Sequence, residues 1–146
     1  MALTIRSMTQ ADKAEWHRLW TAYLEFYETS VPEKVYAATF ARLLDPARPT
    51  QNALVAESEG ALVGLVHYIY HPHNWKLEDV CYLQDLYADP SVRGQGVGRG
   101  LIEAVYAAAD ANGTPMVYWL TQDFNAVARQ LYDRVAKLTP FIKYQR

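Results

Sequence analysis

Glycine occupies every second position of residues 94–100, and this pattern constrains the fold more than any other feature of the chain. The segment before it reads as a strand and the segment after it reads as a helix. The N–H groups in the first turn of a helix lack intrahelical acceptors, so they converge at such a junction and form an anion site. Glycine has no Cβ atom to keep a phosphate away, and Arg93 and Arg99 add charge-assisted hydrogen bonds. The pattern therefore predicts a phosphate-binding turn, because a turn that only lets strand and helix pack needs fewer glycines.

The spacing of these glycines excludes two common phosphate-binding loops. No Gly-Lys-Ser/Thr sequence is present, which disfavours a P-loop kinase or ATPase. The dinucleotide pattern G-x-G-x-x-G also fails, because the sixth position counted from Gly94 is Arg99 and the sixth from Gly96 is Leu101. The phosphate ligand is therefore expected to be of another kind.

Apolar periodicity and turn residues divide the rest of the chain into short elements. Strands are predicted at residues 3–8, 53–57, 61–70, 77–88, 116–120 and 141–144. Helices are predicted after the N-cap residue Thr9, from Pro32 to the break at Asp45, and at residues 101–111 and 125–136. The strand, helix, strand order around the glycine turn implies a parallel strand pair. The sequence therefore predicts one α/β domain, α+β by some conventions, over residues 1–146, with a mixed, mostly antiparallel sheet and about four helices.

The first helix carries a stripe of large apolar and aromatic side chains at spacings of three and four residues. The stripe consists of Trp16, Leu19, Trp20, Tyr23, Leu24 and Tyr27. Such a stripe normally packs in the core, although its tyrosines are also suited to line a ligand pocket.

Composition excludes several classes of protein. Apolar residues make up 51% and charged residues 21%, which is ordinary for a globular chain, and a net charge of -2 gives no reason to expect a nucleic acid partner. Cys81 is the only cysteine, which excludes an internal disulfide and favours a reducing compartment. No leader-like segment or long apolar run is present, so we expect a cytoplasmic protein with no membrane partner. His71 and His73 have no third ligand at a recognisable spacing, so no metal site is predicted.

Two motifs resemble those of a known family. Residues 93–98 are similar to the Q/R-x-x-G-x-G/A signature of the GNAT superfamily of N-acetyltransferases, with Asp89-Pro90 before it and Leu101-Ile102 after it. Residues 125–132 resemble the N-x-x-A-x-x-L-Y helix of the same family. The likeness is closest to the small microbial branch that includes histone and polyamine acetyltransferases. It implies a GNAT-like sheet with a splayed parallel strand pair, and transfer of an acetyl group from acetyl-CoA to a primary amine of a polyamine, a small molecule or a protein lysine.

The resemblance also implies which residues hold acetyl-CoA. In the family, the strand before the glycine turn offers backbone groups to the pantetheine, which here fall on Leu86, Tyr87 and Ala88. An asparagine at the start of the last helix contacts the cofactor, and this residue is Asn125. The amides that bind the pyrophosphate fall on Arg93, Gly94, Gln95, Gly96, Val97, Gly98 and Arg99.

Acetyl transfer to an amine needs a neutral nitrogen, a donor for the oxyanion and a proton for the leaving thiolate. Asp85 is the leading carboxylate for a base or an ammonium ligand, and a buried carboxylate that only orders a loop is an equal alternative. A backbone N–H near Leu86 is the expected oxyanion donor. By the resemblance, Tyr132 lies beside the sulfur and is the general-acid candidate, although it would also serve to pack its helix on the sheet. Cys81 has no paired histidine motif, so direct transfer without an acyl-enzyme is expected.

The acceptor is not determined by the sequence. Tyr27, Glu28 and Asp85 are the substrate-binding candidates, because aromatic and acidic side chains bind ammonium groups. Two other classes stay open: a non-catalytic acyl-CoA-binding or sensing module, and a protein-interaction domain that binds no CoA.

The end of the chain departs from the family pattern. Many relatives follow the last helix with a Gly-Phe pair and two strands, whereas this chain has Val135-Ala136-Lys137 and about ten further residues. An incomplete sheet edge is a liability that a partner subunit covers, so we expect a homodimer that involves residues 139–146.

Overall fold

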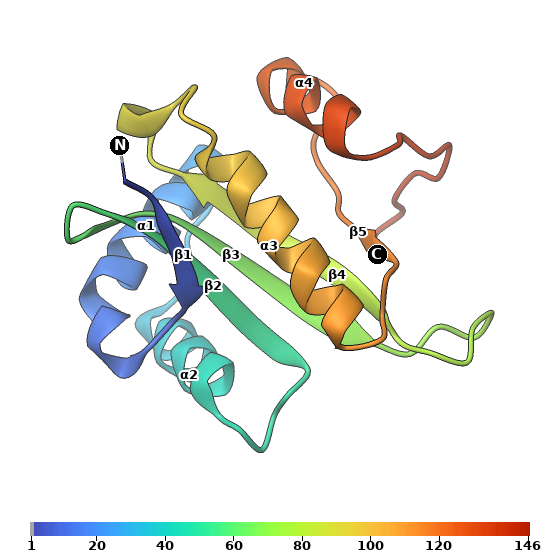
Figure 1. The fold of residues 1–146 in the computed structure, drawn as a ribbon, viewed down its shortest axis with the longest axis horizontal. Helices are drawn as coiled ribbons and strands as arrows, with labels where there is room; N and C mark the ends of the chain where they lie inside the picture. Colours follow the sequence, from blue (N-terminus) through green and yellow to red (C-terminus); the bar gives the residue numbers. More distant parts are fainter. Residues whose placement is uncertain (1) are drawn as a thin grey trace.

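A single mixed sheet forms the centre of the structure (Figure 1), a computed structural model that describes residues 2–146. Its five strands follow the order of the sequence, and the first four are antiparallel to their neighbours while the last pair is parallel. The strands are β1 Thr4–Ser7, β2 Gln51–Ser58, β3 Ala61–His71, β4 Val80–Ala88 and β5 Val117–Tyr118. The predicted mixed, mostly antiparallel sheet with a parallel pair is confirmed.

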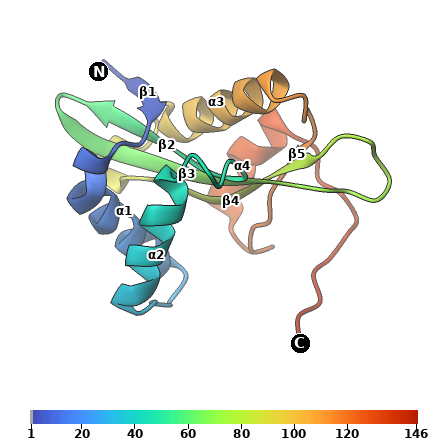
Figure 2. The same cartoon turned by 90° about the horizontal axis from the view of Figure 1, so that it is seen from below.

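Helices cover both faces of the sheet (Figure 2). Helices α1 (Lys13–Phe26) and α2 (Glu33–Leu44) pack on one face, and α3 (Val97–Ala111) packs on the other. Helix α4 (Ala126–Val135) adds its apolar side to the α3 face. Two short 3-10 turns, η1 (Gln10–Asp12) and η2 (Pro90–Val92), precede α1 and α3.

The two faces of the sheet hold separate apolar clusters because side chains alternate along a strand. In β3, Leu65 belongs to the cluster under α1 and α2, and the next residue, Val66, belongs to the cluster under α3. The predicted stripe of α1 supplies the first cluster with four buried side chains, Trp16, Leu19, Trp20 and Leu24. Its two tyrosines, Tyr23 and Tyr27, are half-buried, and Tyr23 packs against that cluster.

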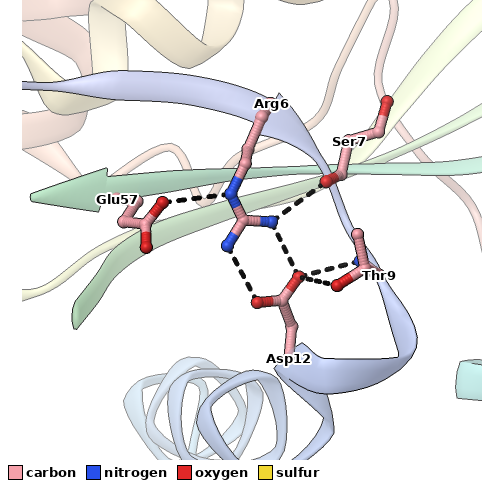
Figure 3. Close-up of polar contacts among 5 residues, drawn as sticks. All are labelled: Arg6, Ser7, Thr9, Asp12 and Glu57. Carbon is pink, nitrogen blue, oxygen red and sulfur yellow. Dashed lines mark hydrogen bonds and ion pairs between the residues drawn. The ribbon is translucent and has the colours of Figure 1, made fainter. Parts of the chain in front are cut away.

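An ion-pair network fastens the start of the chain to the sheet (Figure 3). The Asp12 carboxylate accepts two N–H bonds from the Arg6 guanidinium, at 2.8 and 2.9 Å, and one from the Thr9 backbone at 2.8 Å. Arg6 Nε also donates to Glu57 in β2 at 3.1 Å. The network therefore joins β1, η1 and β2.

The predicted strand at residues 141–144 is wrong. The chain from Lys137 to Arg146 has no helix or strand, and it runs away from the sheet in Figure 2. A strand needs a neighbour for its backbone N–H and C=O groups, and β5, at two residues, is too short to provide one. Four large apolar side chains of this tail are exposed: Leu138, Phe141, Ile142 and Tyr144.

The bounds of several other elements also differ from the prediction, and β5 covers only Val117–Tyr118 where a strand at 116–120 was predicted. Helix α3 begins at Val97 and not at residue 101, so that Gly98 and Gly100 are helical. A Cβ atom on Gly100 would lie 2.9 Å from Cδ1 of Ile5, so this glycine allows close packing of α3 on β1. Strand β4 begins at Val80 and not at residue 77, because Leu77 belongs to the exposed β3–β4 loop.

No helix in the described part of the chain is long and apolar enough to span a membrane.

Candidate active site

The free edge of β4 positions the candidate site. Strand β5 pairs with Cys81 and Tyr82, and within the described residues no strand continues this pairing toward Ala88. The Asp89 N–H donates to the carbonyl of Val63 in β3. Since backbone groups alternate in direction along a strand, those of Leu86 and Ala88 point to the open edge.

A β-bulge lies in β4 next to this edge. His67 of β3 is opposite Asp85, but the next residue, Tyr68, is opposite Leu83, so Gln84 is the extra residue. A bulge bends its strand and increases the local twist, which carries the end of β4 away from β5. The expected splay of the parallel pair therefore has a local cause.

The glycine turn at the start of α3 has the backbone conformation that the predicted anion site requires. Gly94 and Gly96 have φ values of 76° and 80°, which favour glycine, and a Cβ on either would meet nothing within 4 Å. The first intrahelical bond of α3 runs from Gly100 N–H to the Gly96 carbonyl. The amides of the preceding three residues, 97–99, are those that helix geometry leaves without an intrahelical acceptor. These residues therefore suit a phosphate group that approaches from the open side of the turn.

The arginine side chains of this turn are not oriented toward an anion as its amides are. Arg93 is exposed, and Arg99 Nε donates to Glu103 of the same helix at 2.8 Å. The Gln95 N–H already donates to the carbonyl of Val92. The backbone of Tyr87 faces β3 by the same alternation, and its carbonyl lies 3.0 Å from the position of a Cβ on Gly64. Among the predicted cofactor residues, Leu86, Ala88 and residues 97–99 thus have the clearest geometric basis.

Asp85 lies on the α1 side of β4, as alternation predicts. Its Oδ2 accepts hydrogen bonds from His67 Nδ1 at 2.8 Å and from Trp20 Nε1 at 3.3 Å. The side chain of Asp85 is 13% exposed. The carboxylate is therefore held by the sheet and by α1, and part of its surface stays open.

Three tyrosines surround this carboxylate. Burial, with the adjacent charge of Asp85, raises the pKa of Tyr23. The same two causes raise the pKa of Tyr82, and burial raises that of Tyr27 against a hydrogen bond with Thr121. Each phenol stays protonated at neutral pH, so the carboxylate has an aromatic wall that carries no competing charge.

Tyr132 approaches the site from α4. Its ring lies 5.4 Å from that of Trp119, centroid to centroid, and burial, with a smaller effect from Tyr27, raises the pKa of its phenol to about 12. Asn125 caps α4, because its Oδ1 accepts the Ala128 N–H at 3.4 Å. A cofactor contact of Asn125 stays a prediction beside this structural role.

The structure brings most of the predicted acceptor residues together. Tyr27 is near both Asp85 and Tyr132. Glu28 lies apart in the turn after α1, where it is exposed, has φ 57° and lines an open hollow of about 500 Å³ with Glu25, Thr29 and Ser30. No contact between Glu28 and Asp85 occurs among the described contacts.

Sequence reasoning missed Tyr82 and His67 as neighbours of Asp85. Residues three apart on a regular strand lie on opposite faces, so only the bulge at Gln84 brings Tyr82 to the side of Asp85. The position of His67 opposite Asp85 likewise depends on the register of two strands and on the bulge.

The structure also describes Cys81 and the side chains that could bind a metal ion. Cys81 is fully buried, and burial raises the pKa of its thiol to about 11, so it is a poor nucleophile at neutral pH. Among residues 2–146, no group of three or more His, Cys, Asp or Glu side chains is arranged to hold a metal ion.

The chain belongs to the acetyltransferase (GNAT) family, whose sequence profile matches residues 16–136. It is 40% identical over 145 residues to the D-amino-acid N-acetyltransferase HPA3 of Saccharomyces cerevisiae, a match that covers 99% of this chain and 90% of the relative. It is 30% identical over 138 residues to the thialysine N-epsilon-acetyltransferase of Mus musculus, covering 88% of this chain and 79% of that one.

Solved structures share the fold. The aminoglycoside N-acetyltransferase AAC(6')-Iy, in complex with a bisubstrate analogue, superposes with a TM-score of 0.87 over 100% of this chain and 98% of that one, at 19% identity. The ribosomal-protein-alanine N-acetyltransferase of Brucella melitensis superposes with a TM-score of 0.83 at 22% identity, over 100% and 99% of the two chains. The fold, the family profile and the named relatives together show that the chain is an N-acetyltransferase enzyme.

Proposed function

We propose that this enzyme transfers the acetyl group of acetyl-CoA directly to the primary amine of a free amino acid. The observation that carries the proposal is the half-buried Asp85 carboxylate, which has an aromatic wall and is adjacent to Leu86, whose backbone faces the open edge of β4. An ammonium group suits a carboxylate among tyrosine faces. The names of the two relatives, a D-amino-acid and a thialysine N-acetyltransferase, support an amino acid over a polyamine or a protein lysine.

The open edge and the glycine turn are proposed to hold acetyl-CoA. Leu86 and Ala88 would offer backbone groups to the pantetheine, and the amides of residues 97–99 would bind the pyrophosphate at the start of α3. Bound there, acetyl-CoA would supply the activated acyl group of the reaction.

Three groups of this chain are proposed to act on the reacting atoms. Asp85 takes a proton from the acceptor ammonium, or binds the ammonium before it loses a proton to water, so that a neutral nitrogen forms the new C–N bond. The Leu86 N–H stabilises the charge that develops on the acyl oxygen. Tyr132 gives its phenolic proton to the sulfur as the C–S bond breaks. The buried Cys81 thiol supports direct transfer, because it has no exposed thiolate to carry the acyl group.

The test is acetyl-CoA-dependent release of free thiol, measured with D- and L-amino acids, thialysine, polyamines and a basic peptide. We expect turnover with an amino acid, and a reaction without amine measures background hydrolysis. Turnover with only polyamines or the peptide would show that the proposed amino-acid acceptor is wrong and would identify the acceptor class. Thermal stabilisation by acetyl-CoA without any turnover would contradict the proposed reaction and leave its cofactor site intact.

Asp85→Asn tests the residue that carries the proposal. If the carboxylate anchors the ammonium, we expect the amine KM to rise about tenfold or more, since a hydrogen-bonded charge is lost. If it is the base, kcat falls and the pH-rate profile changes shape. Asp110→Asn, on the exposed side of α3, is the matched control and should change neither. An unchanged amine KM together with an unchanged pH-rate profile in Asp85→Asn would rule out both roles.

A further inference from the structure

His67 is a buried, titratable side chain that has no part in the proposed chemistry. It is 4% exposed and lies in β3 directly opposite Asp85. Two indole rings of α1 flank the imidazole, with centroid distances of 6.1 Å to Trp16 and 5.6 Å to Trp20. The ring is therefore enclosed by α1 on one side and by the sheet on the other.

The contacts of His67 determine its tautomer. Trp16 Nε1 lies 3.0 Å from His67 Nε2, and an indole N–H can only donate. His67 Nε2 must accept this bond, so it carries no proton. The proton of the neutral imidazole then lies on Nδ1, which donates to Asp85 Oδ2 at 2.8 Å. A chain of two hydrogen bonds thus runs from α1 through β3 to β4.

This chain of bonds has a direct consequence for the carboxylate. Two N–H groups, from His67 and Trp20, converge on Oδ2 of Asp85. They also fix the rotation of the carboxyl group, because both donors are held in packed elements. Neither of these N–H groups donates to Oδ1, so the acceptor can reach this oxygen beside the Tyr23 phenol, which also hydrogen-bonds Asp85.

Three features oppose the use of His67 as a base. Its Nε2 is occupied by Trp16, its Nδ1 is occupied by Asp85, and the ring has almost no exposed surface. A group that cannot reach the acceptor can act only through Asp85.

We propose that His67, locked by Trp16 in the tautomer with its proton on Nδ1, is a positioning residue that orients the Asp85 carboxylate toward the acceptor amine. This inference rests on the proposed function, since it assumes that Asp85 meets the amine. The alternative is that the bonds of His67 only join β3, β4 and α1.

The tautomer is tested without any assay of activity. Nitrogen-15 NMR of the unaltered protein, labelled at histidine, reports which ring nitrogen carries the proton at pH 7. The spectrum of His67→Gln identifies the His67 signals among those of the four histidines. We expect a protonated Nδ1 and an unprotonated Nε2, and a proton on Nε2 would overturn the proposal.

Two substitutions of similar polarity separate the two hydrogen bonds. In His67→Asn, the side-chain N–H₂ takes the place of Nδ1 and keeps the bond to Asp85, whereas the acceptor for Trp16 is lost. In His67→Gln, the amide reaches the place of Nε2 and keeps the bond to Trp16, whereas the bond to Asp85 is lost. We expect the amine KM to rise about tenfold in His67→Gln and by less than about threefold in His67→Asn, with the acetyl-CoA KM within about twofold in both.

His73→Gln, in the loop after β3, is the control for loss of a histidine and should leave both KM values unchanged. Equal increases of the amine KM in the Asn and Gln variants, or equal increases of both KM values, would reduce His67 to a structural residue. If the unaltered protein turns over no amine, the proposed function fails and the role of His67 toward the acceptor fails with it. The NMR result would then still decide the tautomer separately.

Discussion

Burial makes the Tyr132 phenol a weaker acid than a phenol in water. Its pKa rises to about 12, chiefly through burial, so the proton stays on the oxygen across the neutral range. A thiolate that forms in the same apolar surroundings is destabilised by the same effect, which keeps proton transfer to sulfur feasible. The raised pKa also means that ionisation of Tyr132 contributes no loss of activity across the neutral range.

Substitution of Tyr132 by Phe removes the proposed acid and keeps the ring. We expect kcat to fall about a hundredfold, the usual size of a general acid–base contribution, while the acetyl-CoA Kd changes little. Steady-state kinetics and calorimetry measure the two quantities. Tyr106→Phe is the control, because this hydroxyl donates to the carbonyl of Val135, the last residue of α4, at 2.8 Å and has no proposed role in the reaction. Equal kcat values for Tyr132→Phe and the unaltered enzyme would remove Tyr132 from the mechanism.

At the scale of elements, the turn before α3 depends on two glycines with positive φ. Gly96, the N-cap residue of α3, has φ 80°, and Gly60 in the β2–β3 turn has the same value with equally open surroundings. Alanine at either position should lower stability by roughly 1 kcal/mol, because an L side chain is strained there.

Affinity for acetyl-CoA should distinguish these two positions. We expect Gly96→Ala to weaken binding about tenfold by calorimetry, since its Cβ projects to the open side of the turn where the pyrophosphate is proposed to lie. Gly96→Pro, which fixes φ at about -65° and removes an N–H, should abolish binding. Gly60→Ala should bind normally. Near-normal affinity in Gly96→Pro would contradict the pyrophosphate assignment.

The ion pair that joins β1 to η1 makes stability depend on acid pH. The side-chain hydrogen bonds of Arg6 outweigh burial and hold the pKa of Asp12 at about 2, below its ordinary value of 3.8. A carboxyl whose pKa is lower in the folded state stabilises the fold above the unfolded value, and this contribution is lost as pH falls through about 2.

Asp12→Asn should therefore lower the free energy of unfolding by about 2 kcal/mol at pH 7 and by much less at pH 2. Urea denaturation at the two pH values measures the difference. A loss of stability in Asp12→Asn that is equal at both pH values would show that the charge of Asp12 does not contribute. Activity should be unaffected, because β1 and β2, which carry the network (Figure 3), lie on the other side of β3 from β4 and its open edge.

At the scale of the whole molecule, the tail after α4 exposes apolar side chains that an isolated subunit leaves in contact with water. Its side chains Phe141, Ile142 and Tyr144 are 79%, 77% and 91% exposed, and β5 ends the sheet after two residues. Exposed apolar side chains and an unpaired sheet edge both favour association with a second copy of the chain.

We expect a homodimer by light scattering at micromolar concentration, and a monomer after deletion of residues 139–146. A monomer of the full chain would contradict the proposal. That residues 1–146 fold as a single domain stays a prediction, for which one cooperative unfolding transition in the same samples is the measurement.

The sequence by itself predicted the features whose causes are local. A glycine turn before a helix needs positive φ and free amides wherever it occurs, and the stripe of Trp16, Leu19 and Leu24 has to be buried in any fold of this chain. The parallel strand pair followed from the right-handed crossover rule. Side-chain alternation, which is also local, placed Asp85 on one face of its strand. It did not identify the side chains that contact Asp85, because these come from other elements.

Only the tertiary structure decided what lies across from each strand. The pairing of Asp85 with His67 depends on a bulge at Gln84, and the free edge that exposes Leu86 depends on β5 ending at Tyr118. Both result from the packing of segments far apart in the chain, where a shift by one residue would exchange the faces of a strand. The local sequence carries the anion site, whereas strand register and packing assemble the carboxylate, the tyrosines and the histidine into one site.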